Sequence, residues 1–270
     1  KSSSKAELTI FCPIIREKTM NSTTNNAVLI KNCLKPFSSF NIKISCSFEF
    51  LKSMGERKSY IEKESKMKME YNQEKKEIIL DRELNRLDRF VLDFCNLLKG
   101  YVIVSGYVSI LLGRSRATED IDLLVPDMNH EKFRTLWNKV HENGFECINV
   151  SDSKEAFDAL KEHAIRFAKK SKPVPNIEFK MIKNDLDTYS YENKIKVILK
   201  DGNLFISPLE VQIAYKLFLA AEGADEELIL DKDIEDARHL YQLFKDKINK
   251  DELLIFINKL NVQKKLKWLK

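Results

Sequence analysis

Residues 101–125 run YVIVSGYVSILLGRSRATEDIDLLV and carry the clearest pattern in the chain. The β-branched run at 101–105 predicts a short buried strand. A second strand is predicted at 120–125, where acidic and apolar residues alternate before a proline. A short helix is expected at 107–112, ending at a glycine. The order predicts two strands joined by a helix and a polar loop.

Two carboxylates, Asp120 and Asp122, lie two positions apart on the second predicted strand. Residues i and i+2 of a strand project from the same face, so these side chains are expected side by side. Adjacent carboxylates repel each other unless a cation lies between them. Mg²⁺ prefers oxygen ligands and leaves positions open for phosphate. Such a pair is also common on solvated strand edges, so the interpretation depends on its neighbours.

The residues upstream of this pair are suited to phosphate binding. Ser105 and Gly106 are small and stand between a strand and a helix, which lets backbone N–H groups approach a phosphate. Arg114 and Arg116 would neutralise the charge of a triphosphate, and Thr118 would orient a carboxylate or a ligand oxygen. Together with the carboxylate pair, these residues indicate a site that handles phosphate.

This combination resembles the nucleotidyltransferase superfamily. The signature of that superfamily is a strand ending in Gly-[Gly/Ser], a spacer, and then [Asp/Glu]-h-[Asp/Glu]-h, where h is apolar. Here 13 residues separate Gly106 from Asp120. More narrowly, RATEDIDL at 116–123 looks like the R-x-T-x-D-I-D-L run of AbiEii-type nucleotidyltransferases, the toxin halves of type IV toxin–antitoxin systems. Ser105 stands where the family usually has its first Gly, and Ser is also small.

The resemblance continues downstream. FISPLE at 205–210, then Lys216, then KDIED at 232–236 are similar to the helical half of the family, which carries a Lys and a K-D-x-x-D run. The resemblance implies that Lys216 contacts the triphosphate, and that Asp233 and Asp236 contact either Lys216 or the nucleotide. Acids in the first turn of a helix also favour the helix dipole, which is the alternative role for both aspartates.

A third carboxylate on a later strand, by the same resemblance, completes the metal site or serves as general base. Glu178 is the candidate, because its apolar neighbours place it on the polar face of a strand. Asp185 and Asp187 are rivals, but they follow that strand and are expected in a loop. The alternative role for Glu178 is an ion pair with Lys180 or Lys196 on an exposed strand face.

The remaining pattern alternates strands with helices and then becomes wholly helical. We predict an α+β fold, a nucleotidyltransferase-like mixed β-sheet flanked by helices and followed by a helical C-terminal subdomain. The expected domains are a poorly patterned, flexible extension at 1–66, a sheet domain at 67–206 and the helical subdomain at 207–270. The other expected elements are helices at 74–99, 130–142, 154–169, 207–222, 232–245, 251–260 and 262–269, strands at 145–150, 176–182, 194–199 and 204–206, a break at 172–175 and a capping box at 207–210.

Charge and composition narrow the class of protein. The chain has 46 Lys and Arg against 41 Asp and Glu, and the whole excess of five lies in residues 1–53. The basic balance is therefore no argument for nucleic-acid binding by the patterned region.

No apolar run approaches the ~20 residues of a membrane helix, so a cytoplasmic protein away from membranes is expected. Residue 1 is not Met, and Met54, Met67 and Met69 precede the first strongly patterned element. Residues 1–53 are therefore interpreted either as a flexible extension or as a segment foreign to the natural protein.

The resemblance implies a Mg²⁺-dependent nucleotidyltransferase, with Mn²⁺ as a substitute metal and an NTP such as ATP as substrate. Asp120, Asp122 and Glu178 would be its catalytic metal ligands. The acceptor would be a hydroxyl of tRNA or of a protein, and a cognate antitoxin would be a partner. Two alternatives stay open: a small-molecule, antibiotic-type nucleotidyltransferase, and a non-catalytic relative that binds a nucleotide or a partner protein.

Overall fold

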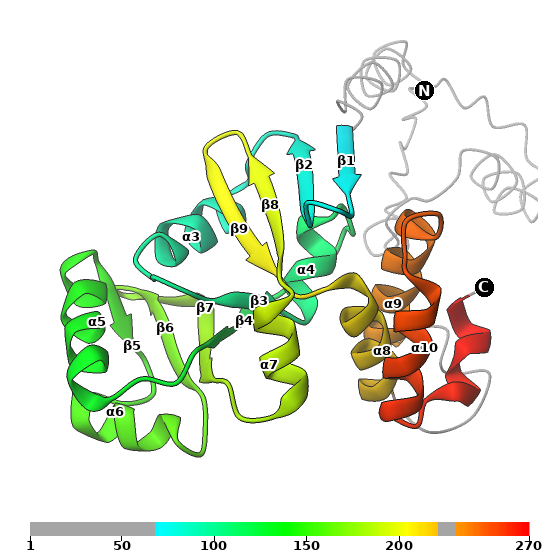
Figure 1. Ribbon diagram of the computed structural model, residues 1–270. Helices are drawn as coiled ribbons and strands as arrows, with labels where there is room; N and C mark the ends of the chain where they lie inside the picture. Colours follow the sequence, from blue (N-terminus) through cyan, green and yellow to red (C-terminus); the bar gives the residue numbers. More distant parts are fainter. Residues whose placement is uncertain (1–67, 221–230, 270) are drawn as a thin grey trace, which may run out of the picture. The chain divides into compact units, whose positions relative to one another are not determined.

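The computed structural model describes residues 68–220 and 231–269 (Figure 1). In this part of the chain, nine strands form one mixed sheet in the order β1-β2-β8-β9-β3-β4-β7-β6-β5. The strands are β1 (Lys68–Asn72), β2 (Glu77–Asp81), β3 (Val102–Val104), β4 (Asp120–Val125), β5 (Phe145–Cys147), β6 (Ile165–Lys169), β7 (Lys172–Met181), β8 (Ile195–Leu199) and β9 (Gly202–Ile206). The helices are α3 (Arg86–Cys95), α4 (Gly106–Leu111), α5 (His130–Glu142), α6 (Ser153–Leu160), α7 (Asp185–Glu192), α8 (Leu209–Leu219), α9 (Lys232–Phe244) and α10 (Lys250–Lys259), followed by a 3₁₀ helix at Gln263–Leu269.

Strands β3, β4 and β7 form the centre of the sheet. Strand β4 runs antiparallel to β3 and parallel to β7. The apolar residues of β4 and β7 alternate with polar ones, and Ile121, Leu123, Ile177 and Phe179 are fully buried. Their burial fixes the register of the two strands, because a slip by one residue would turn the apolar side chains to the other face.

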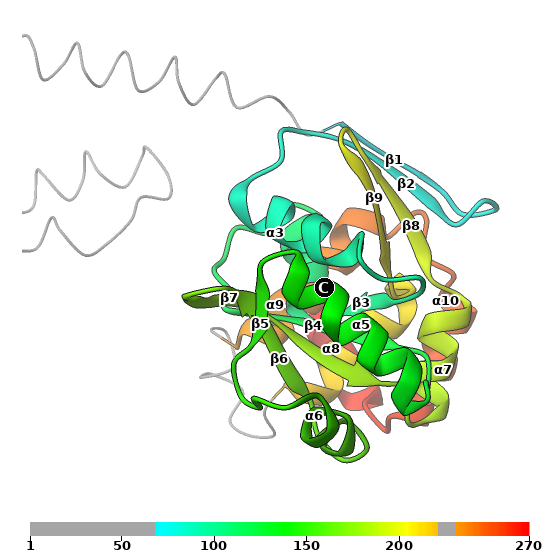
Figure 2. The same cartoon turned by 90° about the vertical axis from the view of Figure 1, so that its left-hand side faces the viewer.

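Helices cover the sheet and continue beyond it. In Figure 1, α5 and α6 lie beside β5 and β6, while α8, α9 and α10 are grouped at the opposite end. The view in Figure 2 shows α3 and α5 in front of the central strands. The expected fold class is confirmed: a mixed sheet flanked by helices precedes a helical segment. One cluster of buried side chains extends from Ile78 to Leu269 and so includes both parts.

The helix expected at 74–99 is wrong over its first half. Residues 77–81 form β2, which pairs antiparallel with β1 and parallel with β8. Ile78 and Leu80 are buried two positions apart, which is strand spacing, whereas Leu80 and Leu84 are four apart, the helical spacing that suggested one long helix. Helix α3 begins only after Asn85, whose side chain accepts the N–H of Asp88 at 2.9 Å while the Asp88 carboxylate accepts the N–H of Asn85 at 2.9 Å. This capping box sets the start of the helix.

The helix expected at 154–169 is also wrong over its second half. Helix α6 ends at Leu160, and β6 follows with Ile165 and Phe167 buried and Arg166 exposed. The apolar residues therefore have period two there, which belongs to a strand. Residues 172–175, expected to break the chain, open β7 instead. Its pairing with β4 starts only at Asn176, so the two prolines need not donate hydrogen bonds to that ladder.

The start of α8 differs from the expected capping box. Pro208 is the N-cap and makes no side-chain cap hydrogen bond. Ser207 instead accepts a hydrogen bond from Gln212, and Glu210 is buried and accepts the backbone N–H of Asn249 at 2.9 Å. These contacts join the start of α8 to its own next turn and to α10. No helix in the described part of the chain is long and apolar enough to cross a membrane.

Candidate functional site

The polar faces of β4 and β7 lie next to each other at the centre of the sheet. The parallel register places Asp120 beside Asn176, Asp122 beside Glu178, and Leu124 beside Lys180. Buried residues between these positions point to the opposite face. The structure therefore brings together the three predicted carboxylates, as their strand positions led us to expect, in two adjacent rungs.

A lysine lies between two of the carboxylates. The Nζ of Lys180 is 2.8 Å from Oδ1 of Asp122 and 2.9 Å from Oε2 of Glu178. Arg166, on the neighbouring strand β6 and in register with Glu178, donates to Oε1 of Glu178 at 3.3 Å. The ion pair named as the alternative for Glu178 is thus present with Lys180, while Lys196 pairs with Glu77.

Asp120 has a different neighbour. The Nδ2 of Asn176 donates to Oδ1 of Asp120 at 2.8 Å, and Asn176 is nearly fully buried. Its Oδ1 is buried and has no hydrogen-bond partner within the described residues. Thr118, expected to orient a carboxylate or a ligand oxygen, donates instead to the backbone oxygen of Asp120 at 2.9 Å. Thr118 therefore fixes the start of β4.

Burial and neighbouring charges shift the protonation of this cluster. Burial raises the pKa of Asp122, Glu178 adds to the rise, and Lys180 opposes it. Burial acts upward on Glu178 as well, but the adjacent Asp122 and the Lys180 ammonium outweigh it and lower the pKa of Glu178 to about 2. Burial lowers the pKa of Lys180, but the two carboxylates outweigh burial and raise it. At neutral pH Glu178 is an anion and Lys180 a cation.

The donor set suits a hard divalent cation. Asp120, Asp122 and Glu178 offer carboxylate oxygens, the ligands that Mg²⁺ and Mn²⁺ prefer, and the orphaned amide oxygen of Asn176 lies on the same rung as Asp120. In the described residues, however, no group of three His, Cys, Asp or Glu side chains is arranged so that it could hold a metal ion as it stands. The carboxylates of Asp122 and Glu178 are instead held together by Lys180.

The turn between β3 and α4 lies next to the carboxylates. Val104 is the register partner of Asp122, and Ser105 follows with a φ of 64°, a conformation uncommon for a residue with a side chain. A Cβ on Gly106 would lie 2.1 Å from Nη2 of Arg116, so glycine is required for the close approach of that guanidinium. The predicted turn of small residues lies between β3 and α4, with Arg116 packed directly against it, and phosphate binding by this turn stays a prediction.

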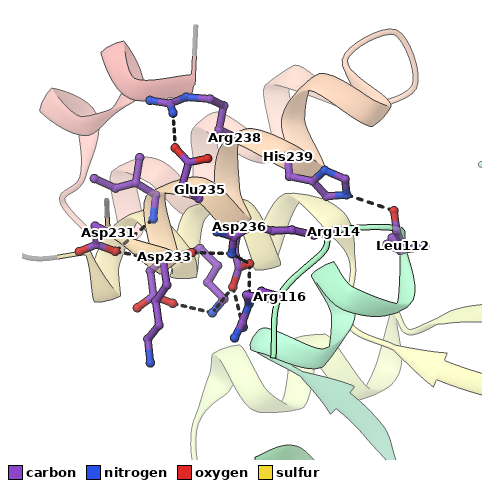
Figure 3. Close-up of polar contacts among 12 residues, drawn as sticks. Leu112, Arg114, Arg116, Asp231, Asp233, Glu235, Asp236, Arg238 and His239 are labelled. Carbon is purple, nitrogen blue, oxygen red and sulfur yellow. Dashed lines mark hydrogen bonds and ion pairs between the residues drawn. The ribbon is translucent and has the colours of Figure 1, made fainter. Parts of the chain in front are cut away.

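The other predicted nucleotide-binding residues form an ion-pair network (Figure 3). Asp236 of α9 is fully buried and accepts hydrogen bonds from Arg114 and from Arg116, whose Nε and Nη2 lie at 3.1 and 3.0 Å. The Nζ of Lys216 on α8 lies 2.9 Å from Asp236 and 2.6 Å from Asp233. Burial acts to raise the pKa of Asp236, but Lys216 and Arg116 outweigh it and lower that pKa.

This network, which we call the Asp236 network, joins the loop after α4 to helices α8 and α9. It consists of Arg114, Arg116, Lys216, Asp233 and Asp236 and therefore carries three positive and two negative charges. The expected contact of Asp233 and Asp236 with Lys216 is present. Binding of a triphosphate by Arg114, Arg116 and Lys216 stays a prediction. The same three cations are needed to neutralise the buried carboxylate of Asp236.

A cavity of about 480 Å³ opens beside Asp122, while Asp120 and Glu178 are not part of its lining. Its lining includes Asp122 and Lys180 from the sheet, Ser105 from the turn after β3, and Gln212 and Tyr215 from α8. Gln212 is almost fully buried and donates to Ser207, while its Oε1 has no partner within the described part of the chain. The cavity is of a size that takes a small molecule or one end of a larger one.

Sequence reasoning missed several members of this site. Asn176 and Arg166 were not considered, and Lys180 was named only as an ion-pair partner. Their places follow from the pairing of β7 with β4 and β6, which the residues of one strand do not reveal. The rivals Asp185 and Asp187 are in the first turn of α7, which corrects the expected loop, and Asp187 accepts the backbone N–H of Lys183 at 3.2 Å.

No protein-family model matches the chain, and no curated protein matches it. Among solved structures, the chain is similar to an antigenic nucleotidyltransferase-like protein from Paracoccidioides brasiliensis, with 15% identity, 68% of this chain and 94% of that chain covered, and a TM-score of 0.42. It is also similar to ANT(2″)-Ia, solved in complex with adenylyl-2″-tobramycin, with 14% identity, coverage of 65% and 95%, and a TM-score of 0.42. At such values the likeness carries no functional argument, and the assignment of function depends on the residues of the site.

Proposed function

We propose that this protein is a nucleotidyltransferase, which moves a nucleoside monophosphate from an NTP to an acceptor hydroxyl. The observation that carries the proposal is the meeting of Asp120, Asp122 and Glu178 on two adjacent parallel strands. The turn at Ser105 and Gly106 leads into the same place, as the resemblance to nucleotidyltransferases implies. In this reaction the acceptor oxygen forms a bond to the α-phosphorus, the bond from that phosphorus to the β-phosphate oxygen breaks, and pyrophosphate leaves with both electrons of the bond. The acceptor proton goes to solvent.

The carboxylates would hold the metal. Asp120 and Asp122 would bind Mg²⁺ with help from Glu178, and the bound ion would supply charge neutralisation for the triphosphate. Glu178 with a pKa of about 2 is a weak base at neutral pH, so its role would be that of an anionic ligand and not of a general base. Ser105, Gly106 and the cations of the Asp236 network would seat the phosphates, with Arg116 nearest the turn.

Two observations support a proposal for the acceptor. The resemblance to AbiEii-type proteins favours the hydroxyl of a tRNA or a protein, a toxin role and a cognate antitoxin. The cavity of about 480 Å³ beside Asp122 favours a small acceptor or a single terminal nucleoside, since it is too small for a folded macromolecule. A tRNA end satisfies both, and an antibiotic-type small molecule is the second candidate.

Transfer of radioactive label tests the proposal. Purified protein is incubated with each α-³²P-labelled NTP, Mg²⁺, and total RNA, total protein or a panel of small hydroxyl compounds. We expect label to become covalently attached to one class of acceptor. The variants Asp120→Asn and Asp122→Asn should each lower the rate by more than about 100-fold, because loss of even an outer-shell contact at a metal site costs up to about 100-fold.

The matched control is Asp127→Asn, which removes an exposed carboxylate just after β4. Its labelling rate should equal that of the unaltered protein. Mg²⁺-dependent binding of NTP without any covalent label, across all acceptors, would instead favour a non-catalytic relative. Equal labelling by the Asp120→Asn protein would show that the carboxylates of β4 are not the reaction centre.

A further inference from the structure

Lys180 occupies the position between two carboxylates where a cation is needed. Its Nζ is nearly equidistant from Asp122 Oδ1 and Glu178 Oε2, at 2.8 and 2.9 Å. The three residues come from two adjacent strands whose register is set by the buried core, so their side chains meet without help from a loop. An ammonium group with three N–H donors suits two carboxylates at once.

The charges around Lys180 show what it neutralises. The carboxylates that contact Lys180 are those of Asp122 and Glu178, and Asp120 lies two residues before Asp122 on the same face of β4. Among the described residues, Arg166 is the other cation that contacts one of these carboxylates, Glu178. The three carboxylates Asp120, Asp122 and Glu178 and the two cations Lys180 and Arg166 together carry one net negative charge. Without Lys180 the remaining groups would carry two, and the Asp122 and Glu178 carboxylates would repel each other.

We infer that Lys180 takes the place of one divalent cation, so that the site binds a single metal ion where three carboxylates alone would bind two. This inference rests on the proposed function. A bound ion would use Asp120 and the second oxygen of Asp122, with Glu178, which Lys180 holds in place, as the third carboxylate ligand. Lys180 is thus a positioning residue, because it acts through the carboxylates and not on the substrate. Two-metal sites stabilise both the attacking and the leaving oxygen of a phosphoryl displacement, and here a fixed ammonium supplies part of that positive charge.

The number of Mn²⁺ ions bound per chain tests the inference without any activity measurement. Mn²⁺ is titrated into the full-length protein, and free Mn²⁺ is followed by electron paramagnetic resonance. We expect one ion in the unaltered protein and none in Asp120→Asn. Lys180→Met, which keeps the length of the side chain but removes its charge, should bind two ions. Lys180→Arg, which restores a cation, should return the number to one.

Lys196→Met is the matched control. Lys196 also lies on a strand of the same sheet, pairs with Glu77 at 3.4 Å, and its side chain has the same exposed fraction as that of Lys180, 36%. Loss of an ion pair of similar exposure should leave the number of bound ions at one. Thermal melting of each variant shows whether it is folded, and Lys180→Gln, which also removes the charge and should bind two ions, provides the answer if Lys180→Met does not fold.

Two results would overturn the inference. The first is that the unaltered protein binds two Mn²⁺ ions per chain. The second is that Lys180→Met binds the same number of Mn²⁺ ions as the unaltered protein, whether that number is one or none. The labelling experiment separates these results from failure of the proposed function: label transfer with an unchanged ion number removes only the role of Lys180. Absence of both label transfer and Mn²⁺ binding removes the proposed function together with the inference.

Discussion

The carboxylates of this site differ sharply in their protonation although they lie on adjacent rungs. Asp122 has a raised pKa and Glu178 a pKa of about 2, and both contact the same ammonium. The difference arises because burial dominates at Asp122, whereas two neighbours dominate at Glu178. Such a divergence of pKa values between neighbouring acids is common at functional sites.

A dependence of stability on pH follows from Glu178. Its folded pKa lies below its ordinary value of 4.5, so the carboxylate stabilises the fold above about pH 4.5 and this contribution is lost as the pH falls toward 2. We expect the difference in unfolding free energy between the unaltered protein and Glu178→Gln to be nearly constant above about pH 4.5 and to shrink as the pH falls from there toward 2. Urea unfolding at several pH values measures it, and a difference that grows toward low pH would contradict the described pairing.

At the residue scale, Asp120 and Asp122 could be found from the sequence because their spacing of two is a local property of one strand. Glu178 could be found because Ile177 and Phe179 on either side of it are apolar. The roles of Asn176 and Lys180 could not, because they depend on which strand pairs with which and in what register. That register is decided by burial of side chains far apart in the chain.

The Asp236 network joins three elements of the fold through buried charges, and each of its residues is needed to keep those charges neutralised. The loop after α4 contacts α8 and α9 through the Asp236 network, where one fully buried carboxylate faces three cations. Removing one partner of a buried ion pair leaves uncompensated charge, which costs more than the pair itself contributes. The network therefore holds the loop before β4 in place, and with it the start of the strand that carries Asp120.

We expect Asp236→Asn to lower the free energy of unfolding by about 3–5 kcal/mol, because Arg114, Arg116 and Lys216 would keep their charges with little to neutralise them. Asp233→Asn is the comparison. Asp233 is partly exposed and contacts only Lys216 in the network, so a smaller loss of about 1 kcal/mol is expected. Urea unfolding measures both, and equal losses would show that Asp236 is not the centre of the network.

Element boundaries were the least predictable part of the fold. The apolar residues at 154–169 and at 74–99 fit a helical period, yet strands occupy 165–169 and 77–81. Short apolar runs satisfy both periods, and pairing with β7 and β8 decides between them. In contrast, the strands predicted at 194–199 and 204–206 do form the β8–β9 hairpin, although β9 begins two residues earlier, at Gly202.

At the scale of the whole molecule, the sheet and the C-terminal helices share one core. Buried residues from Ile78 in β2 to Leu269 belong to a single cluster, although a subdomain boundary was predicted at residue 207. A core that crosses a boundary couples the stability of the two sides. The expected division of the chain at 207 stays a prediction, and the expected extension at 1–66 lies outside the described residues.

The two tryptophans of the chain report on the two sides of that boundary. Trp137 is on α5 beside the sheet, and Trp268 is in the last 3₁₀ helix. We expect the fluorescence of Trp137→Phe and Trp268→Phe proteins to show unfolding transitions at the same urea concentration, after correction for any change in stability seen by circular dichroism. Two separate transitions within one protein would mean that the parts unfold independently.

The central claim is that the carboxylates of β4 and β7 support transfer of a nucleoside monophosphate. The most direct measurement compares NTPs labelled at the α- or the γ-phosphate, incubated with the protein, Mg²⁺ and the acceptor class that accepts label. The account predicts that α-label becomes attached to the acceptor and that γ-label is released in pyrophosphate, both only when Asp120 and Asp122 are intact. Attachment of γ-label to the acceptor, or transfer that survives Asp122→Asn, would contradict it.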